Sequence, residues 1–151
     1  MVYKKSWKYI LIKDDSKCCK DLGMFRIKAL KNFRDVSKGD LGGYVKGYYN
    51  LSQFGDCWVY DKASVYTHAR VSGNAVVKDE AQVYGIAIVF GNAMISEQSM
   101  VFSNAQVFGN AQVYGLAKVY ERAVVSGNAR VFGNAWIHGN TFVSGFTNIN
   151  K

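Results

Sequence analysis

A six-residue repeat governs most of this sequence and restricts what it can fold into. Stepping by six from Val59 to Ile149 meets sixteen positions, and every one of them is Val or Ile. Four residues after each of the first fifteen stands a small residue, which is Ala in twelve cases and Ser or Thr in the others. Gly-Asn dipeptides recur between these positions, so the unit is Val-x-Gly-Asn-Ala-x. A period of six matches neither an α-helix nor a long alternating strand, and it therefore predicts a repeat architecture.

Each unit suits one short strand and one corner. In the stretch Ala-x-Val-x, the Ala and Val side chains point to the same face and predict a buried interior. Gly-Asn tolerates the left-handed backbone that a tight corner needs. Three such sides close a triangular coil of 18 residues, so we expect an all-β solenoid. The stretch resembles the hexapeptide-repeat proteins, and this resemblance implies a left-handed parallel β-helix.

The first 44 residues do not repeat, and we expect them to form a small N-terminal β cap before a β-helix that covers residues 45–151. The segments 8–12 and 24–30 are predicted to be strands. The segment 32–44 contains three glycines and is predicted to be a turn or loop. A cap of this kind would cover the open edge of the first coil.

The outward positions are unusually rich in aromatic residues, and residues 18 apart fall on the same side of the prism. Contiguous apolar surface of this kind marks an interface, so we expect a homo-oligomer. The resemblance to hexapeptide-repeat proteins implies a trimer, with a dimer as the next choice. The expected interface residues are Tyr66, Tyr84, Phe102, Tyr120, Trp136, Phe90 and Phe108.

The positive charge is concentrated in the cap and the first coil. Lys and Arg outnumber Asp and Glu by 19 to 11 in the whole chain. Residues 1–58 hold 12 of these basic residues against 6 Asp. Scattered lysines commonly serve only solvation. Arginine beside aromatic rings also suits a nucleotide-like anion, because the ring stacks on a base while the guanidinium binds phosphate. The expected ligand-binding residues are Arg26, Lys28, Arg34, Tyr44, Tyr48 and Trp58.

Several other classes of function lack support in the sequence. No apolar run reaches the roughly 18 to 20 residues of a membrane span, and the N-terminus lacks a signal-peptide pattern. Cys18, Cys19 and Cys57 with two distant histidines match neither a disulfide framework nor a metal site. The glycines mark corners and match no cofactor-binding fingerprint. We therefore expect a reduced, cytoplasmic protein without metal or cofactor, and we do not expect duplex DNA as its partner.

The resemblance to hexapeptide-repeat proteins also raises the possibility of an acyltransferase, since many of those proteins use acetyl-CoA. In such enzymes a histidine between subunits acts as general base, and an extruded loop often interrupts the coils. This chain has only His68, in a corner, and His138, which points outward in the last coil. We expect no carboxylate to orient either imidazole and no enzymatic activity, with His138 and His68 as the candidate residues if there is one.

The junction of cap and coil resembles a more specific group. The run from Phe25 to Val45 and the run from Asn50 to Tyr60 are similar to the head of a mostly uncharacterised family of β-helix proteins from bacteria, prophages and phages. Some of these proteins carry a provisional acetyltransferase label. The resemblance implies a phage-type accessory protein acting in the host cytoplasm. The matching residues, which can serve structure or function, are Arg26, Asp35, Gly39, Gly42, Gly43, Asn50, Ser52, Gly55 and Trp58.

These observations together predict a non-enzymatic, homo-oligomeric binding protein. Its partner would be an anionic nucleotide-like molecule or a host defence protein, so the protein could counteract a host defence. The alternatives are an acetyltransferase and a structural or assembly protein.

Overall fold

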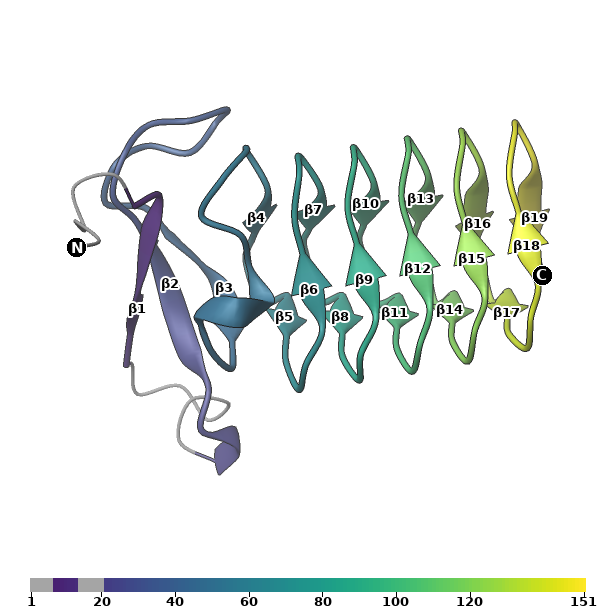
Figure 1. Cartoon of the computed structure of the whole chain (residues 1–151), viewed down its shortest axis with the longest axis horizontal. Helices are drawn as coiled ribbons and strands as arrows, with labels where there is room; N and C mark the ends of the chain where they lie inside the picture. The colour runs from purple at the N-terminus through teal and green to yellow at the C-terminus, as the bar shows by residue number, and fades with distance from the viewer. Residues whose placement is uncertain (1–6, 14–20) are drawn as a thin grey trace.

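The computed structural model describes residues 7–13 and 21–151 and contains a solenoid with a β cap at its N-terminal end (Figure 1). The solenoid advances by one coil every 18 residues, as the pairing of Gln112 with Arg130 illustrates. Each coil contributes one strand to each of three parallel sheets. The predicted all-β fold, a left-handed parallel β-helix of triangular 18-residue coils with a small N-terminal β cap, is confirmed.

The three sheets form the three sides of the prism. Sheet 1 contains β1 (Tyr9–Ile12), β2 (Phe25–Ala29), β3 (Leu41–Val45), β5 (Ser64–Val65), β8 (Gln82–Val83), β11 (Met100–Val101), β14 (Lys118–Val119) and β17 (Trp136–Ile137). Sheet 2 contains β6 (Arg70–Val71), β9 (Ile88–Val89), β12 (Gln106–Val107), β15 (Val124–Val125) and β18 (Phe142–Val143). Sheet 3 contains β4 (Trp58–Val59), β7 (Val76–Val77), β10 (Met94–Ile95), β13 (Gln112–Val113), β16 (Arg130–Phe132) and β19 (Asn148–Asn150). A short 3-10 helix, η2 (Tyr48–Asn50), comes directly before Leu51, which forms an isolated parallel bridge with Val71.

The interior is built from the repeated Val and Ala positions. Val65, Val83 and Val101 are completely buried, and so are the small residues two positions before them, Ala63, Ala81 and Ser99. Full burial of a valine side chain stabilises a fold by roughly 1.5 kcal/mol or more. The repeat also extends upstream as expected, because Val45 pairs with Val65 and Leu51 with Val71.

The corners require a left-handed backbone at their first residue. Gly109 has φ +67°, and a Cβ atom there would lie 2.9 Å from the backbone nitrogen of Gly127 in the next coil. At equivalent corners without glycine, Asp79, Glu97 and Glu121 adopt φ between 59° and 61°. Their carboxylates accept hydrogen bonds from backbone N–H groups one coil further on. These acidic corner residues therefore stabilise the stacking of coils.

The cap is an antiparallel extension of sheet 1. β1 pairs with β2 and β2 with β3, which confirms strands within the predicted segments 8–12 and 24–30. The prediction of a turn or loop over 32–44 is wrong at its end, because β3 begins at Leu41. β3 also pairs in parallel with β5, so the expected boundary at residues 44 and 45 falls inside a strand shared by cap and coil. Two glycines in β3, Gly42 and Gly43, permit this close packing, because a Cβ atom at either would collide with the neighbouring strands.

The cap covers the outer face of the first coil on sheet 3. The ring of Trp58 is only 1% exposed and lies against the rings of Tyr9 and Phe33, with centroids 6.1 Å and 5.1 Å away. The hydroxyl of Tyr9 donates a hydrogen bond to the backbone oxygen of Leu51 at 2.6 Å. Aromatic packing thus fixes the cap to the solenoid.

Tyr9 makes stability sensitive to alkaline pH. Burial raises the pKa of Tyr9 well above its ordinary value of 10.0, and the nearby Cys57 thiol acts in the same direction. When the pH lies above 10.0 but below the raised pKa of the folded chain, the unfolded chain has released the phenolic proton and the folded chain still keeps it. The free energy of unfolding should then fall with rising pH, by up to about 1.4 kcal/mol per pH unit from this group. Urea unfolding of wild type and Tyr9→Phe between roughly pH 9 and 11 should give a shallower decline for Tyr9→Phe, and equal slopes would contradict this assignment.

Candidate ligand-binding site

A groove lies between the cap and sheet 1 at the start of the solenoid, and we call it the cap groove. Its volume is about 580 Å³. Compared with three other surface grooves in the described residues, it is the one whose lining contains no carboxylate. Its lining consists of Leu22, Met24, Tyr44, Lys62, Ser64, Tyr66 and Gln82.

Strand register explains why the cap groove is hollow. Tyr44 of β3 pairs with Ser64 of β5, and Ser64 pairs with Gln82 of β8. These three residues therefore form one outward column on sheet 1. Serine is the smallest of them, so the floor of the groove is low between a tyrosine and a glutamine. The repeat positions Leu51 and Val59 are eight residues apart instead of six, and this two-residue insertion places Tyr44 over Ser64 at a spacing of 20 residues instead of 18.

A ladder of stacked rings runs along the neighbouring column of sheet 1, and we call it the aromatic column. It consists of Tyr66, Tyr84, Phe102 and Tyr120, whose successive centroids are 4.9 to 5.0 Å apart and whose planes are nearly parallel. Tyr66 is the first ring of the column, and one of its faces stacks on Tyr84. No ring of the described residues stacks on its other face. The Tyr66 hydroxyl donates to Oε1 of Gln82 at 2.8 Å, which holds both side chains at the groove.

Cations surround this end of the aromatic column. Lys62 lines the groove, and the guanidinium of Arg26 lies 5.6 Å from the centroid of the Tyr44 ring. Nε of Arg26 also donates to the backbone oxygen of Gly42 at 2.9 Å, so the guanidinium is held in place. Lys46 lies beside the groove and donates to the backbone oxygen of Leu22 at 2.9 Å. The groove therefore combines an aromatic surface with positive charge.

The six ligand-binding residues expected from the sequence do not meet in one place. Tyr44 lines the cap groove and Arg26 lies over its ring, while Lys28 is exposed two residues after Arg26 on β2. Arg34 lies at a different corner, where Nη1 donates to the backbone oxygens of Asp56 and Asn74. The Tyr48 ring packs edge-on against Trp7. Buried Trp58 is not accessible to a ligand, because the cap covers its ring.

Of the seven groove residues, sequence reasoning named only Tyr44 as a ligand-binding candidate; it missed Leu22 and Met24 in the cap, and Lys62, Ser64, Tyr66 and Gln82 in the first coils. Tyr66 had been assigned only to an interface between subunits. The signal that could have found them is the position of the insertion. Once two residues are added to the 18-residue spacing, Tyr44 falls above Ser64, and the small residue between larger ones marks a hollow.

The corner around Arg34 forms a second groove, but its lining mixes charges of both signs. Asp35 accepts a hydrogen bond from the Tyr60 hydroxyl at 2.6 Å. Burial, and then this hydrogen bond to a carboxylate, raises the pKa of Tyr60. The lining also contains Asp61 and Asp79 opposite Arg34 and Lys78. This mixed set is less suited to an anion than the cap groove.

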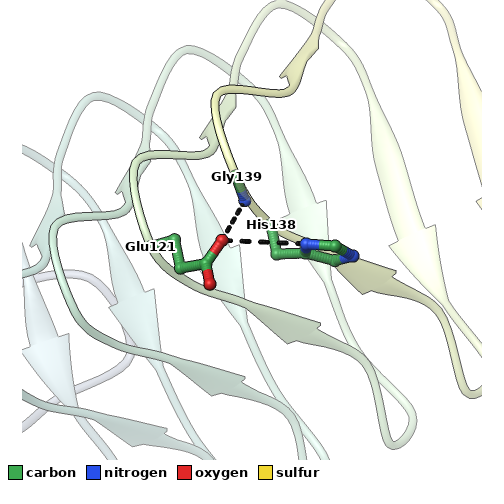
Figure 2. Close-up of polar contacts among 3 residues, drawn as sticks. All are labelled: Glu121, His138 and Gly139. Atoms are coloured by element: carbon green, nitrogen blue, oxygen red, sulfur yellow. Dashed lines mark hydrogen bonds and ion pairs between the residues drawn. The ribbon is translucent and has the colours of Figure 1, made fainter.

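His138 has a carboxylate neighbour, contrary to expectation. Oε2 of Glu121 lies 3.7 Å from Nδ1 of His138 and accepts a hydrogen bond from the backbone N–H of Gly139 (Figure 2). We expected no carboxylate placed to orient either imidazole, and Glu121 does lie next to the His138 ring. The 18-residue spacing between Glu121 and Gly139 could have revealed it. At 3.7 Å and with both side chains about half exposed, the contact is a weak, solvent-screened one.

His68 and the expected interface residues lie where the repeat predicts them. His68 is exposed in a corner, 6.1 Å from the Tyr49 ring. Phe90 and Phe108 stack at 4.8 Å on sheet 2, away from the aromatic column of sheet 1. Trp136 is 58% exposed at the end of sheet 1. The residues expected at an interface thus belong to two different sides of the prism.

Metal ligands and membrane-spanning helices are absent from residues 7–13 and 21–151. No group of three His, Cys, Asp or Glu side chains there can hold a metal ion. No helix in the same ranges is long and apolar enough to cross a membrane. Cys18 and Cys19, which carried the prediction about disulfides, lie outside the described residues.

Fold and groove together define a β-solenoid protein with a capped N-terminal end and a basic, aromatic groove at that cap. Comparison with known families gives a local similarity in agreement with this class. A family model described as YdcK Beta solenoid repeat matches residues 117–139. The match covers little more than one coil, so it supports the repeat and leaves the cap without a counterpart. No curated protein matches the chain.

Proposed function

We propose that the protein is a non-enzymatic, homo-oligomeric β-helix that captures an anionic nucleotide-like ligand in the cap groove. The observation that carries this proposal is Tyr66, the first ring of the aromatic column, in a groove whose described lining contains Lys62 and no carboxylate. The proposal moves the expected site away from Arg34 and Trp58 and keeps Arg26 and Tyr44.

The two kinds of groups in the groove match the two parts of a nucleotide. A base stacked on an aromatic side chain contributes roughly 1 to 3 kcal/mol to binding, whichever base it is. Lys62 can neutralise a phosphate, and charge-assisted hydrogen bonds of this type are stronger than neutral ones. The amide nitrogen of Gln82 can donate to a base, since its oxygen already accepts from Tyr66.

Binding to wild type and groove variants tests the proposal. We expect calorimetry with a panel of mononucleotides, cyclic dinucleotides and ADP-ribose to find a ligand, and native mass spectrometry of gently purified protein to find bound mass. Tyr66→Ala and Lys62→Ala should each weaken binding about tenfold or more, since each removes at least about 1.4 kcal/mol. Tyr114→Ala and Lys78→Ala are matched controls on sheet 3 and should bind as wild type does.

Two outcomes would contradict the nucleotide proposal. One is the absence of binding across the panel by a folded wild-type protein. The other is binding that Tyr66→Ala and Tyr114→Ala weaken equally. A host protein or a structural role would then become the better hypothesis, and a pull-down with the intact chain would separate these two.

Self-association is supported by apolar groups on sheet 2 and at its flanking corner. Ile86, Ile88 and Phe142 are 53%, 38% and 70% exposed. A cyclic oligomer would cover such a side on every copy. The same native mass measurement reports the copy number, for which we propose three, and a monomer would overturn this part of the proposal.

An acetyltransferase is the second candidate, because Glu121 lies near His138. A carboxylate that orients an imidazole is a common arrangement for a general base. Turnover of acetyl-CoA that is lost in His138→Ala but kept in His68→Ala would favour this candidate over ligand capture.

A further inference from the structure

Lys8 and Cys57 form a contact between cap and first coil that has no part in the cap groove. Both residues are completely buried. Nζ of Lys8 lies 3.3 Å from Sγ of Cys57. Two backbone oxygens hold Nζ in this position, that of Cys57 at 2.7 Å and that of Gly55 at 3.2 Å. An amine and a thiol from distant parts of the sequence are thus kept in contact, away from bulk water.

The surroundings favour the uncharged forms of both groups. Burial lowers the pKa of Lys8 and raises the pKa of Cys57, while the attraction between the two groups opposes both changes. A neutral amine keeps the lone pair that lets its nitrogen react. A fully buried lysine is rare in proteins.

The thiol is not needed for packing. Cys57 occupies the inward position that Ala75 and Ala93 fill one and two coils later, and all three side chains are fully buried. A methyl group therefore suffices at this level of the prism. The cysteine, with the lysine held against it, is a departure from the repeat in the coil that the cap covers.

We propose that Lys8 and Cys57 are a site of oxidative modification, at which one oxygen atom bridges the lysine nitrogen and the cysteine sulfur as an N–O–S cross-link. The oxidant is hydrogen peroxide. One N–H and the S–H bond break, and N–O and O–S bonds form. Nitrogen and sulfur each give up two electrons, which reduce two peroxide molecules. Of the four peroxide oxygens one stays in the bridge and three leave as water, together with the two hydrogens removed from Lys8 and Cys57.

A small oxidant has a short path to the sulfur. Sγ of Cys57 lies 3.5 Å from the backbone oxygen of Ser52 and 3.8 Å from that of Phe54. The segment 52–56 therefore covers the thiol, and its Phe54 side chain is 85% exposed. Local opening of a short surface segment costs much less than global unfolding. A buried thiol is usually inert, and the amine held against this one supplies the second reacting group.

The cross-link can be detected by mass. The full chain with Cys18→Ser and Cys19→Ser, which leaves Cys57 as its only thiol, is treated with hydrogen peroxide in the folded state and digested with trypsin. We expect residues 6–13 joined to residues 47–62, without cleavage after Lys8, at a mass about 14 Da above the sum of the two peptides. Thiol reductant should reverse the change, and Cys57→Ala, which restores the alanine of the repeat, should not form it.

Stability gives a second readout. A bridge between residues 49 positions apart closes a long loop, so the cross-linked protein should melt roughly 5 to 10 °C higher than the reduced protein. Sulfinic or sulfonic acid at Cys57 with unmodified Lys8 would overturn the proposal. So would a joined peptide about 2 Da lighter than the sum, since this is a direct N–S bond without oxygen. An unchanged thiol at peroxide concentrations that oxidise the methionines would overturn it as well.

Discussion

Gly43→Ala is expected to lower the free energy of unfolding by about 3 kcal/mol or more, and to release the cap from the first coil. A Cβ atom at Gly43 would collide with the backbone oxygen of Ala63 and lie 2.6 Å from Cγ1 of Val59. The oxygen belongs to the backbone of the first coil, and the Val59 side chain is completely buried, so neither can easily give way. Because β3 pairs with both β2 and β5, a shift of β3 would disturb two strand pairs at once.

Urea unfolding of Gly43→Ala beside Gly145→Asn separates this steric effect from the general loss of a glycine. Gly145 has φ +65°, which asparagine tolerates, and a Cβ atom there would meet nothing within 4 Å. Gly145→Asn should therefore change stability by less than about 0.5 kcal/mol. If Gly43→Ala were equally mild, the close approach of β3 to the coil would be wrong.

Asn50→Ala should cost about 3 kcal/mol, because a buried hydrogen-bond network would lose its centre. Asn50 is completely buried. Its Oδ1 accepts from the backbone N–H groups of Lys46 and Gly47, both at 2.9 Å. Its Nδ2 donates to the backbone oxygen of Ala69 at 2.8 Å. One side chain thus replaces the backbone pairing that is interrupted where the first coil turns.

The matched control for Asn50 is Asn128→Ala, an exposed corner asparagine of the repeat, which should cost less than about 0.5 kcal/mol. Asn50→Asp adds a sharper comparison. It keeps an acceptor for Lys46 and Gly47 but turns an oxygen toward the oxygen of Ala69, so its stability should also fall below wild type. Thermal unfolding of the three variants checks the order, and equal melting temperatures for Asn50→Ala and Asn128→Ala would contradict it.

The solenoid could be predicted from the sequence because every coil repeats the same local choice. Val and Ala alternate with outward residues, and each corner has one residue that accepts a left-handed backbone. The end of the cap could not be predicted in the same way. Glycines such as Gly42 and Gly43 indicate a loop when only local preference is considered. In the structure they lie in a strand, because their missing side chains make room for Ile27 and Val59.

The candidate site was predicted only in part, for a related reason. Arg26 and Tyr44 were identified by residue type, and they do lie at the cap groove. Trp58 was expected on the surface because its position in the repeat points outward. The cap buries it through contacts with Tyr9 and Phe33, which are distant in sequence and follow no period. A repeat fixes which residues share a side, but it contains no information on which side a nonrepeating segment will cover.

The buried residues are alike on all three sides of the prism, whereas the surface residues differ from side to side. This difference determines how the molecule can change its length. Loss of one unit of six residues between Val83 and Val101 would leave valine, alanine and corner in phase, so the core would accept it. Every later residue would, however, turn by one third of a revolution, and Phe102 and Tyr120 would leave the side that carries Tyr66. Loss of eighteen residues would shorten the aromatic column without breaking it. The core would accept a change of six residues, but the surface columns survive only a change of eighteen. Selection on the surface would therefore make this molecule gain or lose length by whole coils.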